Sequence, residues 1–119
     1  MPLSFAAGDY LIFQLEAAFG LLRLLEIEDA DGDPIWHLAA YREMFPDVDT
    51  AEAAIASGSA LSVDLPHTAL TNRAFESTQV ARLGNEKLNE NELWALLEWK
   101  AADDRPVVDR SIRLMLGLR

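Results

Sequence analysis

Three apolar runs in the amino-terminal part of the chain alternate in the way that predicts β-strands. The runs cover residues 9–16, 19–28 and 35–41. In the first run Leu11, Phe13 and Leu15 share one face, as the two-residue period of a strand requires. In the second run one face is interrupted only by Arg23 and otherwise holds Phe19, Leu21, Leu25 and Ile27. The opposite face of that run turns polar at Glu26 and Glu28.

The second and third runs are separated by residues 30–33, whose sequence Ala-Asp-Gly-Asp predicts a tight hairpin turn. A helix over residues 13–28 is the alternative, because the apolar positions 11, 15, 18, 19, 22 and 25 also fit a helical stripe. The turn-like pair Gly8-Asp9 before the first run and the Asp31-Gly32 turn favour strands.

The rest of the chain predicts helices around one further strand region. Asp49 and Glu52 have the spacing of a capping box, and Gly58 is placed to end that short helix. Residues 57–64 read as a loop, residues 65–77 alternate loosely, and residues 78–83 alternate better. Asn89 and Glu92 form a second capping-box pattern.

That second capping box predicts a helix over residues 90–100, with Trp94 flanking a core-facing stripe of Leu93, Leu96 and Leu97. Pro106 suits the first turn of a last helix. In that helix Asp109 and Arg113 would pair, and the apolar stripe would be Val108, Ile112 and Met115.

Composition indicates a single soluble domain over residues 1–119. Half of the chain is hydrophobic, which suffices for one core, and it contains no cysteine, so disulfides and thiolate chemistry are excluded. The first residues lack the basic start of a signal peptide, and no apolar run reaches the length of a membrane span. We therefore expect no membrane association and a location in the bacterial cytoplasm.

The net charge of −10 argues against nucleic acid as a ligand, because binding phosphates requires clustered lysine and arginine. The charge is uneven: residues 1–50 hold ten acidic side chains against two arginines, whereas residues 105–119 carry a net charge of +3. Solubility together with a basic last helix is one explanation of this distribution. The other is an acidic surface that steers a basic partner toward itself.

No motif for catalysis, cofactor binding or metal binding is present in the sequence. Asp29, Asp31 and Asp33 have the spacing of calcium ligands, but Pro34 stands where the loop glycine belongs and Ala40 where the bidentate glutamate belongs. The chain contains no GxSxG, SxxK, GxGxxG or P-loop pattern. We therefore expect no catalytic residue, no metal site and no cofactor.

The two histidines, His37 and His67, do not form an HxH, HxxxH or HExxH pattern, which favours structural or surface roles. They become candidates for a metal site or a general base only if the fold brings them together near an acidic side chain.

Two stretches resemble the opening of a family of bacterial immunity proteins from polymorphic toxin systems. They are Gly8-Asp9-Tyr10-Leu11-Ile12-Phe13-Gln14-Leu15 and Phe19-Gly20-Leu21-Leu22-Arg23-Leu24-Leu25-Glu26. The resemblance covers residues 8–41 and implies a small, bent barrel of SH3 type. The sequence departs from the family pattern at Glu16-Ala17-Ala18, where a glycine-containing turn is expected, and at Leu24, where a β-branched residue is expected.

Pattern and resemblance together predict an α+β fold: a small antiparallel SH3-like barrel or curled sheet, a short mid-chain helix and two carboxyl-terminal helices. The expected function is non-enzymatic binding of another protein, namely immunity-like neutralisation of a basic toxin. The expected contact residues are Asp29, Asp31, Asp33, Glu43, Asp47 and Asp49. Two alternatives stay open: a small enzyme or ligand-binding domain whose site includes His37 and His67, and a homo-oligomer with a leucine-rich interface.

Overall fold

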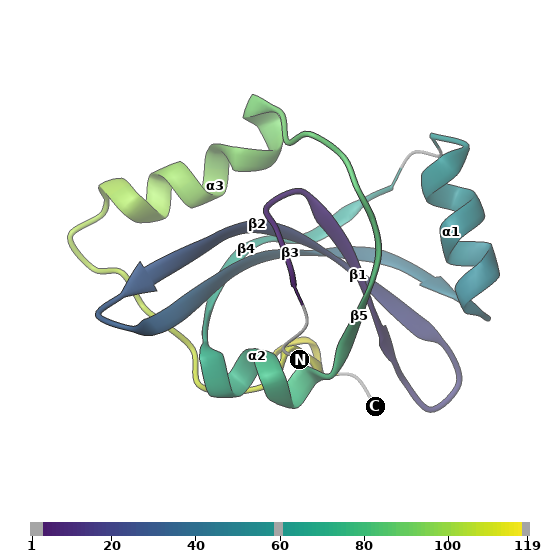
Figure 1. Ribbon diagram of the computed structural model, residues 1–119, viewed down its shortest axis with the longest axis horizontal. Helices are drawn as coiled ribbons and strands as arrows, with labels where there is room; N and C mark the ends of the chain where they lie inside the picture. The colour runs from purple at the N-terminus through teal and green to yellow at the C-terminus, as the bar shows by residue number, and fades with distance from the viewer. Residues whose placement is uncertain (1–3, 59–60, 118–119) are drawn as a thin grey trace.

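The structure is a computed structural model that describes residues 4–58 and 61–117 (Figure 1). Its elements, in chain order, are β1 (Asp9–Gln14), β2 (Phe19–Ala30), β3 (Asp33–Phe45), α1 (Val48–Ala56), β4 (Val63–Thr71), α2 (Asn72–Thr78), β5 (Val80–Asn85), α3 (Glu90–Ala101) and α4 (Ile112–Leu116). The fold is therefore α+β, as the sequence predicts, and both carboxyl-terminal helices are present.

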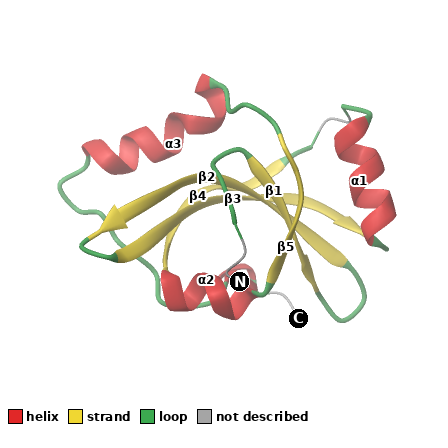
Figure 2. Ribbon diagram, in the orientation of Figure 1, coloured by secondary structure: helices red, strands yellow, loops and turns green. Residues whose placement is uncertain are grey.

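The five strands form one antiparallel sheet in the order β4-β3-β2-β1-β5. The sheet is strongly curled but not closed, because β4 and β5 are its two edges. Its concave side arches over α2, whereas α3 lies on the opposite, convex side (Figure 2). Helix α1 stands beside the end of the β2–β3 hairpin that is remote from the hairpin turn (Figure 1).

The main core fills the concave side of the sheet. Leu11, Leu24, Leu38 and Leu70 from four strands are fully buried there, with Phe75 of α2 packed against them. A second cluster around Tyr10, Ile12 and Phe45 packs against Ala51 of α1. A third and smaller cluster lies beneath α3 and consists of Leu25, Ala39 and Leu96, flanked by Leu88 and Leu93.

The three predicted strands, residues 9–16, 19–28 and 35–41, are confirmed as β1, β2 and β3, although β1 already ends at Gln14. The helical alternative for residues 13–28 is wrong. The hairpin turn is also confirmed: Asp31 and Gly32 have φ angles of 55° and 86°, and Asp and Gly tolerate this left-handed region best. A β-bulge between Leu24 and Glu26 changes the predicted faces of β2. Beyond the bulge Ile27 no longer shares a face with Leu25 and is 37% exposed.

The middle of the chain differs from the prediction at two places. Helix α1 is capped by Asp47 rather than Asp49, because Asp47 has extended backbone and its carboxylate accepts the Thr50 N–H at 2.7 Å. Residues 72–78 form helix α2, which the loose alternation of residues 65–77 did not predict. The Ser57-Gly58 end of α1 and the strand after residue 78 are confirmed.

The carboxyl-terminal region confirms one helix start and corrects the other. The capping box of Asn89 and Glu92 opens α3 as predicted. The last helix begins at Ile112 with Ser111 as its N-cap, so Pro106 is outside it. Residues before it are extended, and Val108 pairs with Leu70 as an isolated parallel bridge.

Because this segment is extended, the predicted pair of Asp109 and Arg113 does not form. Asp109 instead contacts Arg73 and Thr71, and Arg113 donates to the Gln14 carbonyl at 3.1 Å. Among the described residues, no helix has the length and apolar character needed to cross a membrane.

Candidate functional site

Helix α3 is apolar on both of its faces, and within residues 4–58 and 61–117 only one of the two faces is covered. Leu96 is buried on the inner face and Leu93 packs beside it against the sheet. Trp94 and Leu97, one turn apart on the outer face, are 59% and 58% exposed. The prediction that Leu97 faces the core is therefore wrong. A helix with apolar residues on both faces is typical of one that is covered on both sides.

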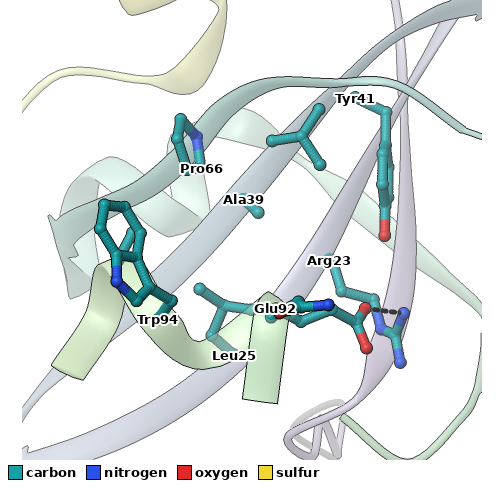
Figure 3. Close-up of a pocket in the computed structure, with 10 residues that line it drawn as sticks. Arg23, Leu25, Ala39, Tyr41, Pro66, Glu92 and Trp94 are labelled. Carbon is teal, nitrogen blue, oxygen red and sulfur yellow. Dashed lines mark hydrogen bonds and ion pairs between the residues drawn. The ribbon is translucent and has the colours of Figure 1, made fainter. Parts of the chain in front are cut away.

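A pocket lies between the first turns of α3 and strands β2, β3 and β4 (Figure 3). Its cavity volume is about 50 Å³, and its lining residues are Arg23, Leu25, Ala39, Tyr41, Val63, Pro66, Asn91, Glu92, Trp94 and Ala95. Val63 is 48% exposed, and Trp94 and Pro66 stand on the side opposite the Arg23–Glu92 pair. The pocket is thus a largely apolar depression with an exposed tryptophan at its edge.

Arg23 and Glu92 are the only ionised residues among those that line this pocket, and they neutralise each other. The Arg23 side chain is almost fully buried, and its Nη1 donates to Glu92 Oε2 at 2.6 Å. It also donates to the Tyr10 hydroxyl and to the backbone carbonyls of Gly8 and Glu86. These bonds satisfy a buried guanidinium and tie α3 to the sheet.

Burial also raises the pKa values of the two tyrosines beside Arg23. Loss of solvent raises the pKa of Tyr10 to about 12 against the opposing charge of Arg23. Burial likewise raises the pKa of Tyr41. Both hydroxyls are therefore neutral at physiological pH, and neither provides a charge to the pocket.

Two carboxylates bracket the exposed tryptophan. Glu90 and Glu98 lie four residues before and after Trp94, so the three side chains share the outer face of α3. Both glutamates are exposed. The exposed tryptophan of α3 is thus flanked on its own helix by two negative charges.

Beneath the second half of α3, the structure brings His37 and His67 together. His37 is fully buried in β3, and its Nδ1 lies 2.9 Å from Nε2 of His67 in β4. Its other nitrogen, Nε2, lies 2.8 Å from Oε1 of Glu28 in β2. Trp99 of α3 packs edge-on to the His37 ring, with centroids 4.8 Å apart. The condition that sequence alone left open, two histidines beside an acid, is therefore met.

The partially buried His67 is neutral at physiological pH. Desolvation, with a smaller contribution from the neighbouring His37, lowers the pKa of His67 to about 4. A neutral His67 can either accept a proton from His37 or donate one to it. The cluster is therefore a hydrogen-bonded chain from Glu28 through His37 to His67.

The six carboxylates predicted to contact a partner do not form one surface. Asp29, Asp31 and Asp33 are exposed at the turn of the β2–β3 hairpin. The other three, Glu43, Asp47 and Asp49, lie near the opposite end of β3 and in the first turn of α1. Ten residues of strand separate the two groups, a distance of about 30 Å if the strand were straight.

Three of these carboxylates have local structural roles. Asp29 accepts the Gly32 N–H within the turn at 3.2 Å. Glu43 accepts the Ser62 N–H at 2.6 Å. Desolvation raises the pKa of Glu43, but this bond, further hydrogen bonds and the charge of Arg42 together outweigh it and lower the pKa. Hydrogen bonds from Thr50 lower the pKa of the capping residue Asp47. Local contacts therefore account for half of the predicted set.

Sequence reasoning missed the residues that the structure groups around α3. The pocket rim with Trp94 and Val63 has no sequence signature, because it forms between a helix and a strand far apart in the chain. Arg23 did carry a signal, since it is the only charge in an apolar strand face. Glu26 and Glu28 carried one as well, since they alternate on a strand.

No protein-family model matches this chain, and neither does any curated protein or solved structure.

Proposed function

We propose that this protein is a non-enzymatic binding module that holds a basic protein partner on the outer face of α3. The observation that carries the proposal is the exposure of Trp94 and Leu97 on a helix whose opposite face is already buried. A second, exposed apolar face on such a helix is typical of a surface that another protein covers.

Trp94 has the character of an anchor residue. About 60% of its surface is exposed, so roughly 100 Å² of ring is available for burial. At ~25 cal/mol per Å², covering this area would contribute about 2.5 kcal/mol to binding. Tryptophan is enriched among interface residues that dominate affinity, and the depression beside it can accept a side chain of the partner.

Charge supports a basic partner. Glu90 and Glu98 flank the anchor, and the chain as a whole carries a net charge of −10. Such a field accelerates the encounter with a positively charged protein and disfavours an acidic one. The acidic hairpin turn and the α1 end would contribute to this field from a distance.

The identity of the partner as a toxin rests on the resemblance of residues 8–41 to immunity proteins. In this proposal the curled sheet corresponds to a partly open barrel of SH3 type, and the bound protein would be neutralised by occlusion. An enzyme is the less favoured alternative, because the pocket beside α3 is lined by neither histidine. Its ionised residues, Arg23 and Glu92, are engaged with each other.

The partner can be identified by capture from a lysate of the source organism at low and high salt. Three baits are compared: the wild-type chain, Trp94→Ala and Leu114→Ala. Leu114 is a matched control, because it is 67% exposed on a different helix. The proposal requires a basic protein that wild type and Leu114→Ala retain, that Trp94→Ala loses, and that binds one-to-one when both proteins are purified.

Equal recovery by all three baits would contradict the proposal. A second copy of this chain is the competing occupant of the same face. Light scattering separates the two, because self-association would give a dimer that Trp94→Ala dissociates. The proposal predicts a monomer, since two chains of charge −10 repel each other.

A further inference from the structure

Two glutamates of β2 and the buried His37 of β3 form a separate cluster beneath the end of α3. One oxygen each from Glu26 and Glu28 and one nitrogen of His37 lie within 4.8 Å of one another. His37 is fully buried, and the glutamates are partially buried. None of the three lines the pocket beside Trp94.

The strand register explains why the three side chains meet. Glu26 is directly opposite His37 in the β2–β3 pair, so their side chains project from the same face. Glu28 is two residues further along β2 and returns to that face. The β-bulge after Leu24 determines which face these glutamates occupy. Leu25 already faces α3, and the bulge lets the next residue, Glu26, face α3 as well.

His67 contacts the His37 ring on the side that faces away from the two glutamates. Its Nε2 lies 2.9 Å from His37 Nδ1, which leaves the other His37 nitrogen directed at the glutamates. Histidines that ligate a metal commonly donate the N–H of their second nitrogen to a neighbouring acceptor, which fixes the ring. The His67 ring and the edge of Trp99 hold His37 in this orientation.

We propose that Glu26, Glu28 and Nε2 of His37 bind a divalent transition-metal ion of the zinc class, with His67 as the positioning residue. This site is independent of the protein-binding function proposed above. One imidazole nitrogen and two carboxylate oxygens are ligands that zinc accepts, and three protein ligands leave a fourth position for water. The imidazole favours such ions over Mg²⁺ and Ca²⁺, which prefer oxygen ligands alone.

Binding changes the hydrogen bonds of the cluster in a defined way. In the metal-free protein His37 Nε2 is hydrogen-bonded to Glu28 Oε1. A metal needs this nitrogen without a proton, so metal-bound neutral His37 is the tautomer that carries its single ring proton on Nδ1 and donates it to His67 Nε2. Two ligands of one zinc ion are at most about 4.2 Å apart, so rotation of the glutamate side chains must close the cluster.

Lys100 competes with the metal. Its Nζ lies 2.7 Å from Glu26 Oε1, so the ammonium already occupies the negative side of the cluster. Metal binding has to displace this contact. Removal of the Lys100 charge should therefore strengthen metal binding at this cluster. The affinity of an adventitious metal site elsewhere on the surface would not change.

The test is titration of the full, tag-free chain with Zn²⁺ against a chromophoric chelator, with Mg²⁺ and Ca²⁺ as parallel arms. Four variants are compared with wild type: Glu26→Gln, Glu28→Gln, Lys100→Met, and Glu98→Gln as a control on the outer face of α3. Each variant is first checked for a native circular-dichroism spectrum. The buried His37 is left intact, because its replacement endangers folding.

We expect one Zn²⁺ per chain, at least tenfold weaker binding in Glu26→Gln and Glu28→Gln, and tighter binding in Lys100→Met. Glu98→Gln should match wild type, and Mg²⁺ should not compete. Replacement of the positioning residue, His67→Phe, should weaken binding about 10–100-fold without changing the stoichiometry. Absence of Zn²⁺ binding at 100 µM, or equal affinity in wild type, Glu28→Gln and Glu98→Gln, would overturn the proposal.

Discussion

The carboxylate of Glu92 in α3 lies 2.6 Å from the guanidinium of Arg23, which is buried in β2. The same arginine lies over the Tyr10 ring, with its central carbon 4.2 Å from the ring centroid. Because Arg23 contacts β1, the segment before α3 and α3 itself, this pair fixes the helix that carries the proposed binding face. Loss of the Glu92 charge would leave a buried cation with fewer compensating groups.

Glu92→Gln should lower the free energy of unfolding by about 2 kcal/mol. Glutamine at this position preserves the capping box with Asn89, so the change isolates the loss of charge. Urea denaturation measures the effect, with Glu90→Gln as the control, because Glu90 is exposed on the same helical turn. Equal stability of the two variants would show that the ion pair contributes little.

The inner and outer faces of α3 can be distinguished by two adjacent leucines. Leu96 is 2% exposed and Leu97 is 58% exposed. Leu96→Ala should therefore cost about 3 kcal/mol of stability, whereas Leu97→Ala should change it by less than ~0.5 kcal/mol. Thermal and urea unfolding of the two variants provide the measurement. A larger loss in Leu97→Ala would mean that α3 is rotated relative to this structure.

Asp9 predicts a specific dependence of stability on pH. Burial alone would raise the pKa of this fully buried carboxyl, but hydrogen bonds from Asn85, the Ala6 N–H and Arg82 outweigh burial and lower it. The charged form thus stabilises the fold above the ordinary pKa of 3.8, and this contribution is lost as the pH falls through the lowered pKa.

Asp9→Asn should therefore be less stable than wild type at pH 7, by about 2 kcal/mol, and the difference should shrink as the pH falls below about 4. Urea unfolding between pH 7 and pH 2 gives both curves. Asp103→Asn, a change in an exposed loop, should show no such convergence. Parallel curves for wild type and Asp9→Asn would exclude this role of the Asp9 charge.

Gly20 marks a close approach of β2 to an aromatic ring of β1. A Cβ at this position would lie 2.6 Å from Cε1 of Phe13 and closer still to its Cζ. Because Phe13 is buried, the ring cannot move aside freely, and Gly20→Ala should cost about 2 kcal/mol. Gly84→Ala is the matched control in β5, since its Cβ would meet nothing within 4 Å. Comparable stability of the two variants would contradict this account.

The strands were predictable because their signal is local. Alternation of apolar residues and the Asp31-Gly32 turn determine β1, β2 and β3 within short stretches of sequence. The capping box of α3 is equally local. By contrast, the β-bulge after Leu24 interrupts the two-residue period, so the orientation of Ile27 and Glu26 could not be read from alternation.

The candidate sites were beyond sequence reasoning because they depend on long-range register. His37 pairs with Ala69, and this register brings His67, thirty residues further along the chain, against it. Whether Leu96 or Leu97 faces inward depends on where α3 rests on the sheet. Acidic residues are common in this chain, so their number alone gave no indication that the six predicted carboxylates would be divided between two ends of the hairpin.

The central claim, that the outer face of α3 binds a basic protein, is tested most directly by calorimetry with the purified partner. We predict that Trp94→Ala raises the dissociation constant at least thirtyfold, the loss of about 2 kcal/mol expected for an anchor residue. Leu114→Ala should remain within twofold of wild type. Dissociation constants within twofold of wild type for both variants would contradict the claim and place the partner elsewhere on the molecule.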